Sequence, residues 1–253
     1  MEDSWTESYY QSLEFFYWEP QHLGRKKHID SKLNSLEKVQ SHLRAMEVTL
    51  NHNLNMFFLL APEAVRTRFF NLLFGRALSG EHRMHGRGVE EAYGMAGSTQ
   101  PDFFFTSDSN VVAIEMKIEA KSGISQLLKY VLLGLAEELE SGRQKVHHLG
   151  FLGRGDFASQ WKERFDDPAE LKNAAAQTDL SLFLSRHPSR LGTSLPRFAE
   201  ILATMHIGFS TYADFASLLE AAQPTASDRS DSAGVYRKLI QGVVGEFKHR
   251  KLA

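Results

Sequence analysis

The chain has 253 residues, of which 42% are hydrophobic and 24% are charged, and these values suit a soluble globular protein with one large domain or two small ones. Cysteine is absent, which excludes disulfide bonds and thiolate zinc sites and favours a reducing compartment. The formal net charge of −2 gives no general basic signal for nucleic-acid binding, although a local patch decides such binding rather than the total.

No segment for export or for membrane insertion is expected. The first ten residues, MEDSWTESYY, lack a basic segment followed by an apolar core, so they do not resemble a signal peptide. The longest apolar runs, such as Met56–Ala61, are far too short to cross a bilayer. We therefore expect a cytoplasmic protein that makes no membrane contact.

Local positive charge is concentrated in three short basic stretches, at residues 25–27, 83–87 and 248–251. Each is a candidate nucleic-acid contact. The alternative for each is an ordinary solvated surface, because short charge runs are usually exposed faces.

The first part of the chain is predicted to be helical. Aromatic and apolar residues within residues 1–19 are spaced for an amphipathic helix, and a 3–4 pattern over residues 29–57 predicts one long helix. The long helix either pairs as a coiled coil in a dimer or packs on its own domain. The polar residues Gln40 and Glu47 at seam positions favour packing on its own domain.

A second helix is expected over residues 62–78, since Pro62 suits a first helical turn. Residues 79–89 are polar and contain glycine, which predicts a loop. Residues 90–100 fit either a short strand or a helix end.

The middle of the chain predicts a β-hairpin followed by a helix. Two β-prone runs, residues 103–105 and 111–118, flank a turn-rich stretch. The pattern then becomes helical over residues 124–140, and Gly142 ends it. The elements expected after it are a strand at 146–153, helices at 161–165, 168–176, 180–185, 195–204, 212–222 and 235–247, a strand at 206–209 and a mobile loop at 223–232.

Two carboxylates are expected to converge on the hairpin. Asp102 begins one arm and Glu115 lies late in the other, so antiparallel pairing brings them side by side. Mg²⁺ prefers hard oxygen ligands and usually takes only one or two carboxylates from a protein, with water and substrate phosphate completing its shell. Such an ion polarises a phosphoryl oxygen and lowers the pKa of a bound water.

Lys117 is predicted to share this site, because residues i and i+2 of a strand point to the same face. Its ammonium would orient the attacking water or offset charge that grows on the phosphate. The backbone carbonyl of Met116, between the two charged residues, is a further candidate metal ligand. The alternative is a plain surface strand that carries a Glu–Lys pair.

These residues resemble the PD-(D/E)xK nuclease superfamily. The matching residues are Pro101-Asp102 and Glu115-Met116-Lys117, and the next helix carries Gln126 and Tyr130 in the Gln-x-x-x-Tyr arrangement of the RecB-like branch. The resemblance covers about residues 90–152, and the local sequence around Glu115 is similar to that of uncharacterised bacterial members.

This resemblance implies that Asp102 and Glu115 bind Mg²⁺, for which Mn²⁺ would substitute, and that Lys117 assists attack by water. Gln126 and Tyr130 would approach the substrate backbone and the active site. Products with 5′-phosphate and 3′-hydroxyl ends are expected. Many members also carry an acidic residue upstream, for which Glu91 is the candidate, with Glu90 and Glu63 behind it. An ordinary solvated glutamate is the alternative for Glu91.

Other motifs give no function. Glu119 and Lys121 continue the charge alternation of the second arm without an assigned role. Residues 153–155, Gly-Arg-Gly, are too short for a phosphate loop. None of the 11 histidines has the spacing of a zinc site, and no Gly-x-Ser-x-Gly motif for serine hydrolysis is present.

The expected fold is α/β, with a restriction-endonuclease-like core of four to six mixed strands flanked by helices and with helical N- and C-terminal additions. Residues 1–60 are predicted to form a helical arm and residues 61–253 a nuclease-like domain. The expected function is metal-dependent hydrolysis of DNA phosphodiester bonds. Endonuclease and exonuclease action stay open, as does the setting, since the superfamily serves restriction, phage defence, recombination and repair.

Two alternatives to an active nuclease remain at this stage. The first is a catalytically idle nuclease fold that only binds nucleic acid or a partner protein, which the near-neutral charge favours and the complete set of three charged residues disfavours. The second is an adaptor that dimerises through the helix over residues 29–57. A homodimer and a protein partner that supplies DNA recognition also stay open.

Overall fold

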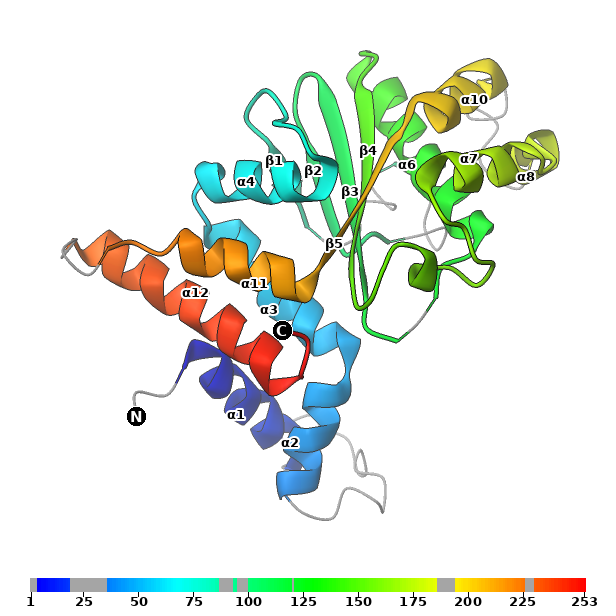
Figure 1. Ribbon diagram of the computed structural model, residues 1–253. Coiled ribbons are helices and arrows are strands. Elements are labelled where there is room, and N and C mark those ends of the chain that lie inside the picture. The colour runs from blue at the N-terminus through cyan, green and yellow to red at the C-terminus, as the bar shows by residue number, and fades with distance from the viewer. Residues whose placement is uncertain are drawn as a thin grey trace. The chain divides into compact units, whose positions relative to one another are not determined.

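The computed structural model describes residues 4–18, 36–86, 93–94, 100–119, 121–185, 194–225 and 230–253. These residues form two compact units (Figure 1). Unit 1 combines residues up to Ala61 with Tyr212–Ala253, and unit 2 comprises Pro62–Thr211. The predicted division at residue 60 falls beside this boundary. Residues 212–253, which we grouped with the nuclease-like domain, cluster instead with the N-terminal helices.

Unit 2 is built on a five-stranded mixed sheet with the order β1-β2-β3-β4-β5. β1 pairs antiparallel with β2 and β2 with β3, whereas β3, β4 and β5 run parallel. This arrangement confirms the predicted α/β class. The strands are β1 (Arg83–His85), β2 (Phe103–Thr106), β3 (Asn110–Lys117), β4 (Val146–Gly153) and β5 (His206–Thr211).

The hairpin between β2 and β3 forms where the sequence predicted it. Ser107 accepts a hydrogen bond from the Asn110 backbone on its Oγ atom at 3.0 Å, which closes the turn. Phe103 is then opposite Ile114 in the register. Continuing that register by one residue places Asp102 beside Glu115, on the opposite face from the phenylalanine.

Helix α6 (Ile124–Ser141) connects the parallel strands β3 and β4 and covers one face of the sheet. Gly142 ends it in the left-handed conformation with φ 65°, as predicted from the glycine. Its core partners include Val111 and Ala113 of β3 and Leu149 of β4. Helices α7 (Pro168–Ala176), α8 (Leu180–Ser185) and α10 (Leu195–Thr204) complete this layer.

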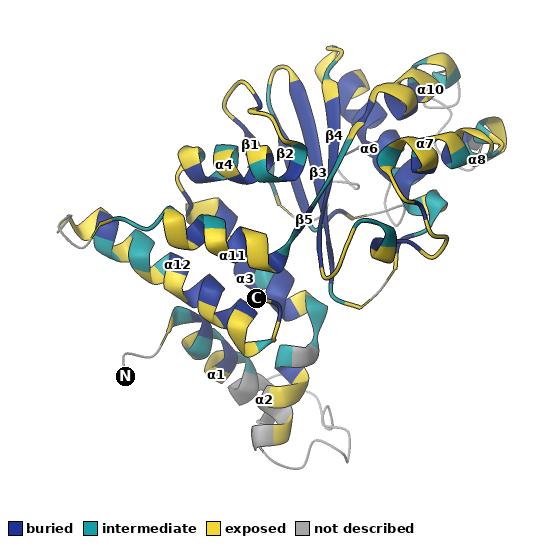
Figure 2. Cartoon of the chain, viewed as in Figure 1, coloured by how far each residue is buried: buried dark blue, intermediate teal, exposed yellow. Residues whose placement is uncertain are grey.

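Helix α4 (Glu63–Phe74) covers the other face of the sheet. Leu73 and Phe74 pack so closely on β4 and β5 that a side chain at Gly150 or Gly208 would collide with them. Successive strand residues point to opposite faces, so β3 presents Ile114 to this layer. Figure 2 shows the consequence, since β2, β3 and most of β4 are buried.

Unit 1 is helical. It consists of α1 (Trp5–Trp18), α2 (Leu36–Ala45), α3 (Glu47–Leu60), α11 (Tyr212–Ala221) and α12 (Asp231–His249). The apolar positions expected at a coiled-coil seam, Leu43, Leu50, Leu54 and Phe57, are buried inside this unit, as the alternative of packing on its own domain predicted.

The single long helix expected over residues 29–57 is wrong where the structure describes it, because α2 and α3 are separated at Met46. Met46 has an extended backbone with φ −74° and ψ 130°. Thr49 donates its hydroxyl to the Leu43 and Met46 carbonyls at 2.6 and 2.8 Å, and Arg250 donates to the Met46 carbonyl at 3.0 Å. These bonds satisfy the groups that the break exposes.

Other sequence expectations need correction. The loop expected at residues 79–89 contains β1, and the helix expected over 62–78 ends at Phe74 because Gly75 adopts φ 65°. The helix expected at 161–165 is absent, since Trp161 instead forms a parallel bridge with Ser122 and the short 3-10 helix η2 (Ala158–Gln160) precedes it. The basic stretch at 25–27 lies outside the described residues.

Candidate active site

Asp102 is fixed at the entry to β2 by a backbone group of the neighbouring strand. Its Oδ2 atom accepts a hydrogen bond from the Met116 N–H at 2.7 Å. In antiparallel pairing the N–H and C=O of one strand residue point to the same neighbour. The Met116 carbonyl is therefore directed to the side of β3 on which Asp102 lies, as a shared ligand set requires.

Glu115 is the centre of a buried polar cluster. Its Oε1 atom accepts hydrogen bonds from Lys117 Nζ at 2.6 Å and from Gln126 Nε2 at 2.6 Å. Its Oε2 atom accepts a hydrogen bond from the Tyr130 hydroxyl. Glu115 is 6% and Lys117 8% exposed, so the alternative of a plain surface strand is wrong.

Helix α6 supplies two members of this cluster from one face. Gln126 and Tyr130 are separated by one helical turn, and Gln126 Nε2 also donates to the Tyr130 hydroxyl at 3.3 Å. The start of the helix is fixed because Ser122 donates its N–H to the Gln160 carbonyl at 2.8 Å and accepts from Lys162 N–H at 2.9 Å. The loops after β3 and β4 are thereby joined.

The Tyr130 hydroxyl is held in its protonated form. Burial raises its pKa well above the usual 10, and the negative charges of Glu115 and Asp102 raise it further. Tyr130 is therefore a hydrogen-bond donor to Glu115 throughout the neutral range.

The donor set fits a divalent cation. A carboxylate has about four lone-pair sites, and the three hydrogen bonds to Glu115 leave one of these on Oε2. Two carboxylates and one ammonium have a formal charge of −1, which favours a cation. Within the described ranges no three His, Cys, Asp or Glu residues group as a metal site. Two carboxylates are sufficient for Mg²⁺, however.

The candidate third acidic residue is not placed. Glu91 and Glu90 lie outside the described residues. Glu63 is described, but its carboxylate contacts Arg66 and the backbone N–H of His82 rather than the cluster around Glu115. The role proposed for Glu91 remains a prediction.

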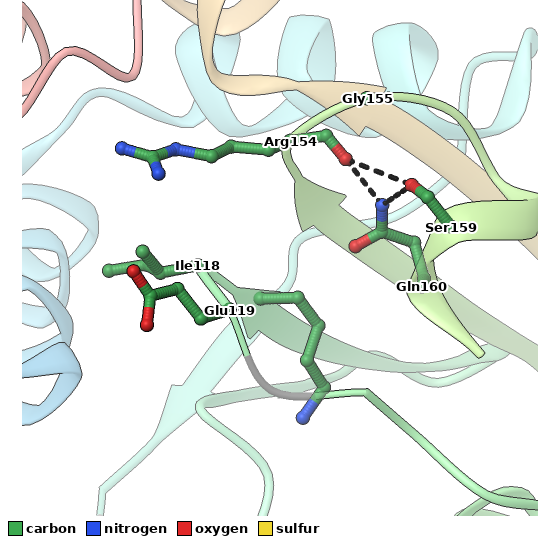
Figure 3. Close-up of a pocket in the computed structure, with 7 residues that line it drawn as sticks. Ile118, Glu119, Arg154, Gly155, Ser159 and Gln160 are labelled. Atoms are coloured by element: carbon green, nitrogen blue, oxygen red, sulfur yellow. Dashed lines mark hydrogen bonds between the residues drawn. The ribbon is translucent and has the colours of Figure 1, made fainter. Parts of the chain in front are cut away.

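A pocket of about 280 Å³ adjoins the cluster at the carboxyl ends of β3 and β4 (Figure 3). Lys117 belongs to both. The other residues that line the pocket are Ile118, Glu119, Arg154, Gly155, Ser159 and Gln160. Sequence reasoning missed the contribution of residues 154–160. Ligand sites of parallel sheets lie outside the carboxyl ends of the strands. The position of these residues directly after β4 could therefore have identified them as candidate site residues.

Comparison with protein-family models, with curated proteins and with solved structures finds no match to this chain. Of the helices that the structure describes, none has both the length and the apolar character needed to cross a membrane. The function must therefore be argued from the cluster and the pocket themselves.

Proposed function

We propose that the protein is a metal-dependent deoxyribonuclease that hydrolyses phosphodiester bonds at the cluster around Glu115. One observation supports this above all others. Lys117 of β3 and Gln126 and Tyr130 of α6 bond the same buried Glu115 carboxylate. Asp102, which directly precedes β2, bonds the adjacent Met116 backbone.

Stability alone gives little reason for such a cluster. Removing a carboxylate and an ammonium from water costs several kcal/mol per ion, and a hydrophobic pair of similar volume is often as stable. Here the pair is at the end of β3 beside an open pocket. The pair is buried and hydrogen-bonded to Gln126 and Tyr130, and burial raises the pKa of Tyr130 well above 10, which together favour a functional site.

The residues have distinct roles in the proposed reaction. Asp102, Glu115 and the Met116 carbonyl would hold Mg²⁺ or Mn²⁺, which supplies Lewis-acid polarisation of the phosphate and a more acidic water. Lys117, held beside Glu115 at 2.6 Å, orients the attacking water and offsets charge developing on the phosphate. Gln126 and Tyr130 fix the Glu115 carboxylate by occupying three of its hydrogen-bonding positions together with Lys117.

The resemblance to the PD-(D/E)xK superfamily supports the same roles. The residues that match its motifs are the ones that lie together in the fold. Gln126 donates to Glu115 at 2.6 Å, a contact that the spacing of the two residues in the sequence does not require. A mixed sheet with β3 and α6 contributing the site also agrees with the core that the resemblance implies.

Cleavage of supercoiled plasmid, linear duplex and single-stranded DNA in Mg²⁺ and in Mn²⁺ tests the proposal. We expect Asp102→Asn, Glu115→Gln and Lys117→Ala each to reduce the cleavage rate by about a hundredfold or more. Glu81→Gln is the matched control, because Glu81 is exposed and precedes β1 at the opposite end of the sheet. Circular dichroism establishes that each variant is folded.

Two outcomes contradict the proposal. If the wild-type protein cleaves none of the three DNA forms with either metal, the proposed nuclease function is wrong. DNA binding without cleavage would instead support the catalytically idle binding module. Cleavage that survives in the Asp102, Glu115 and Lys117 variants would place any activity at another site.

A further inference from the structure

The turn that follows β4 is held rigidly by two side chains. Gln160 donates its Nε2 to the carbonyls of Arg154 and Asp156 at 2.5 and 2.9 Å. Ser159 donates its hydroxyl to the same carbonyls at 3.2 and 2.6 Å. Gln160 is only 4% exposed, so these bonds form away from competing water.

Glycine suits the positions on both sides of Arg154 in this turn. A side chain at Gly153 would collide with the Gln160 Oε1 atom, and Gly155 has φ 74°, a conformation that residues with a Cβ rarely adopt. The Gly-Arg-Gly sequence is therefore too short for a phosphate loop but suited to hold one arginine at the wall of the pocket.

Arg154 is adjacent to the candidate active site in the strand register. Lys117 pairs with Gly153 across β3 and β4, so Arg154 is the first residue beyond that pair. Both cations line the pocket of about 280 Å³. In Figure 3 the Arg154 and Glu119 side chains extend to one side of the pocket, while Gln160 and Ser159 lie on the other.

We propose that this pocket is a second phosphate subsite, in which Arg154 binds the phosphodiester next to the one that is cut. This inference rests on the proposed nuclease function. Arg154 is an exposed residue, and a guanidinium is a planar fork of donors that matches phosphate oxygens. Lys117 lines this pocket and bonds Glu115, so a DNA strand cut at the cluster would carry its neighbouring phosphodiester towards the pocket.

Glu119 adds a negative charge to the proposed subsite, opposite in sign to Arg154, and neutralising it tests the proposal. Its exposed carboxylate lines the same pocket as Arg154 and repels a phosphate bound there. Neutralising Glu119 therefore strengthens binding, whereas removing Arg154 weakens it. A purely structural role for the two side chains predicts no such pair of opposite effects.

Binding of a fluorescein-labelled DNA oligonucleotide, single-stranded and duplex, in the presence of EDTA tests the subsite without catalysis. We expect Arg154→Ala to weaken binding about tenfold. The slope of log K against log salt concentration should become shallower in this variant. The change should be about 0.9 for duplex and about 0.7 for single-stranded DNA, the value of one phosphate contact. Glu119→Gln should strengthen binding. In Mg²⁺, Arg154→Ala should raise KM more than it lowers kcat.

Arg143→Ala is the control for this experiment. Arg143 precedes β4, at the opposite end of the strand from Arg154, and is exposed beside Asp108, so its removal changes the net charge equally. Equal binding and equal salt dependence in the Arg143 and Arg154 variants would overturn the subsite even if the wild type cleaves DNA. Wild-type protein that binds no oligonucleotide would overturn it as well. Wild-type protein that does not cleave DNA, but whose DNA binding still weakens in Arg154→Ala, would contradict the nuclease function and leave the phosphate contact of Arg154 standing.

Discussion

Tyr130 shows how one buried hydroxyl organises the candidate site. It is 2% exposed, and burial together with the nearby carboxylates raises its pKa well above 10, so it donates to Glu115 and does not act as a base. A residue that fixes a ligand in this way changes metal affinity or activity by about tenfold to a hundredfold when its donor is removed.

Tyr130→Phe should therefore reduce both Mn²⁺ affinity, measured by calorimetry, and the cleavage rate by about tenfold or more. Tyr93→Phe is a matched control, because the Tyr93 hydroxyl donates to Glu137 near the other end of α6. Both variants should lose roughly 1–3 kcal/mol of unfolding free energy, the cost of a buried acceptor without its donor. Equal metal affinity in the two variants would show that Tyr130 is only structural.

At the scale of single residues, the site was predictable where chemistry and short spacing coincide. Asp102, Glu115 and Lys117 were found because a hairpin register and a two-residue period place them together. Arg154 and Gln160 were not found, because their approach to Lys117 depends on β4 lying parallel to β3, which no local pattern specifies.

Among the elements, α10 is attached to the sheet layer by a buried ionic network. Arg197 donates Nε to Glu138 Oε2 at 2.8 Å and an Nη2 proton to Oε1 at 2.6 Å. Glu138 Oε1 also contacts His147 Nε2 and the Lys145 N–H, both at 2.8 Å. Burial raises the pKa of Glu138, but these hydrogen bonds outweigh it and lower the pKa to about 2.

Arg197→Ala leaves the buried Glu138 carboxylate without its principal counter-charge. We expect a loss of about 2–4 kcal/mol in unfolding free energy, measured by urea unfolding at neutral pH. Arg143→Ala removes an exposed pair with Asp108, whose side chains are 60% and 94% exposed, and should change stability by less than about 1 kcal/mol. Similar losses in the two variants would contradict a role for Arg197 in fastening α10.

Element boundaries were predictable where a glycine or proline marks them and not where a distant contact does. Gly142 ends α6 as expected, because its φ of 65° suits glycine. The break at Met46 has no glycine or proline to mark it, and the apolar spacing resumes at Leu50 beyond the polar Glu47. Arg250, which is far away in the sequence, supplies a hydrogen bond to the Met46 carbonyl.

At the scale of the whole molecule, the fold class followed from the sequence but the composition of the units did not. Apolar β-prone runs alternating with helical periodicity predicted a mixed sheet flanked by helices. The packing of α11 and α12 with the N-terminal helices is determined by burial between segments separated by about 150 residues. Net charge was equally uninformative, since −2 overall coexists with Lys117 and Arg154 at one end of the sheet.

Unit 2 contains a set of histidines that resist protonation. Burial lowers the pKa of His148 to about 3, and burial likewise lowers the pKa values of His82, His85 and His206. Positively charged neighbours add to the effect at His148. The groups that contribute are His206, Arg76, His147 and His82, and the ring of His148 packs against Phe74 and His206.

These shifts predict that acid begins to destabilise the protein near pH 6.5, above the range in which carboxylates titrate. An unfolded histidine takes up a proton near pH 6.5, but folded His148 does so only near pH 3. The contribution of neutral His148 to the free energy of unfolding is therefore complete above about pH 6.5. It is lost progressively as the pH falls towards 3, by at most about 1.4 kcal/mol per pH unit. Thermal unfolding followed by circular dichroism should show a falling midpoint over this interval.

The variant His148→Gln isolates this effect from the other groups that titrate in acid. It removes the ring packing on Phe74 and His206, so it should lower the thermal midpoint at neutral pH. Because glutamine takes up no proton, the midpoint should then fall less steeply with acid than in the wild type. His42→Gln, at an exposed position of unit 1, should leave the pH dependence unchanged. Parallel wild-type and His148→Gln curves would show that another group causes the acid sensitivity.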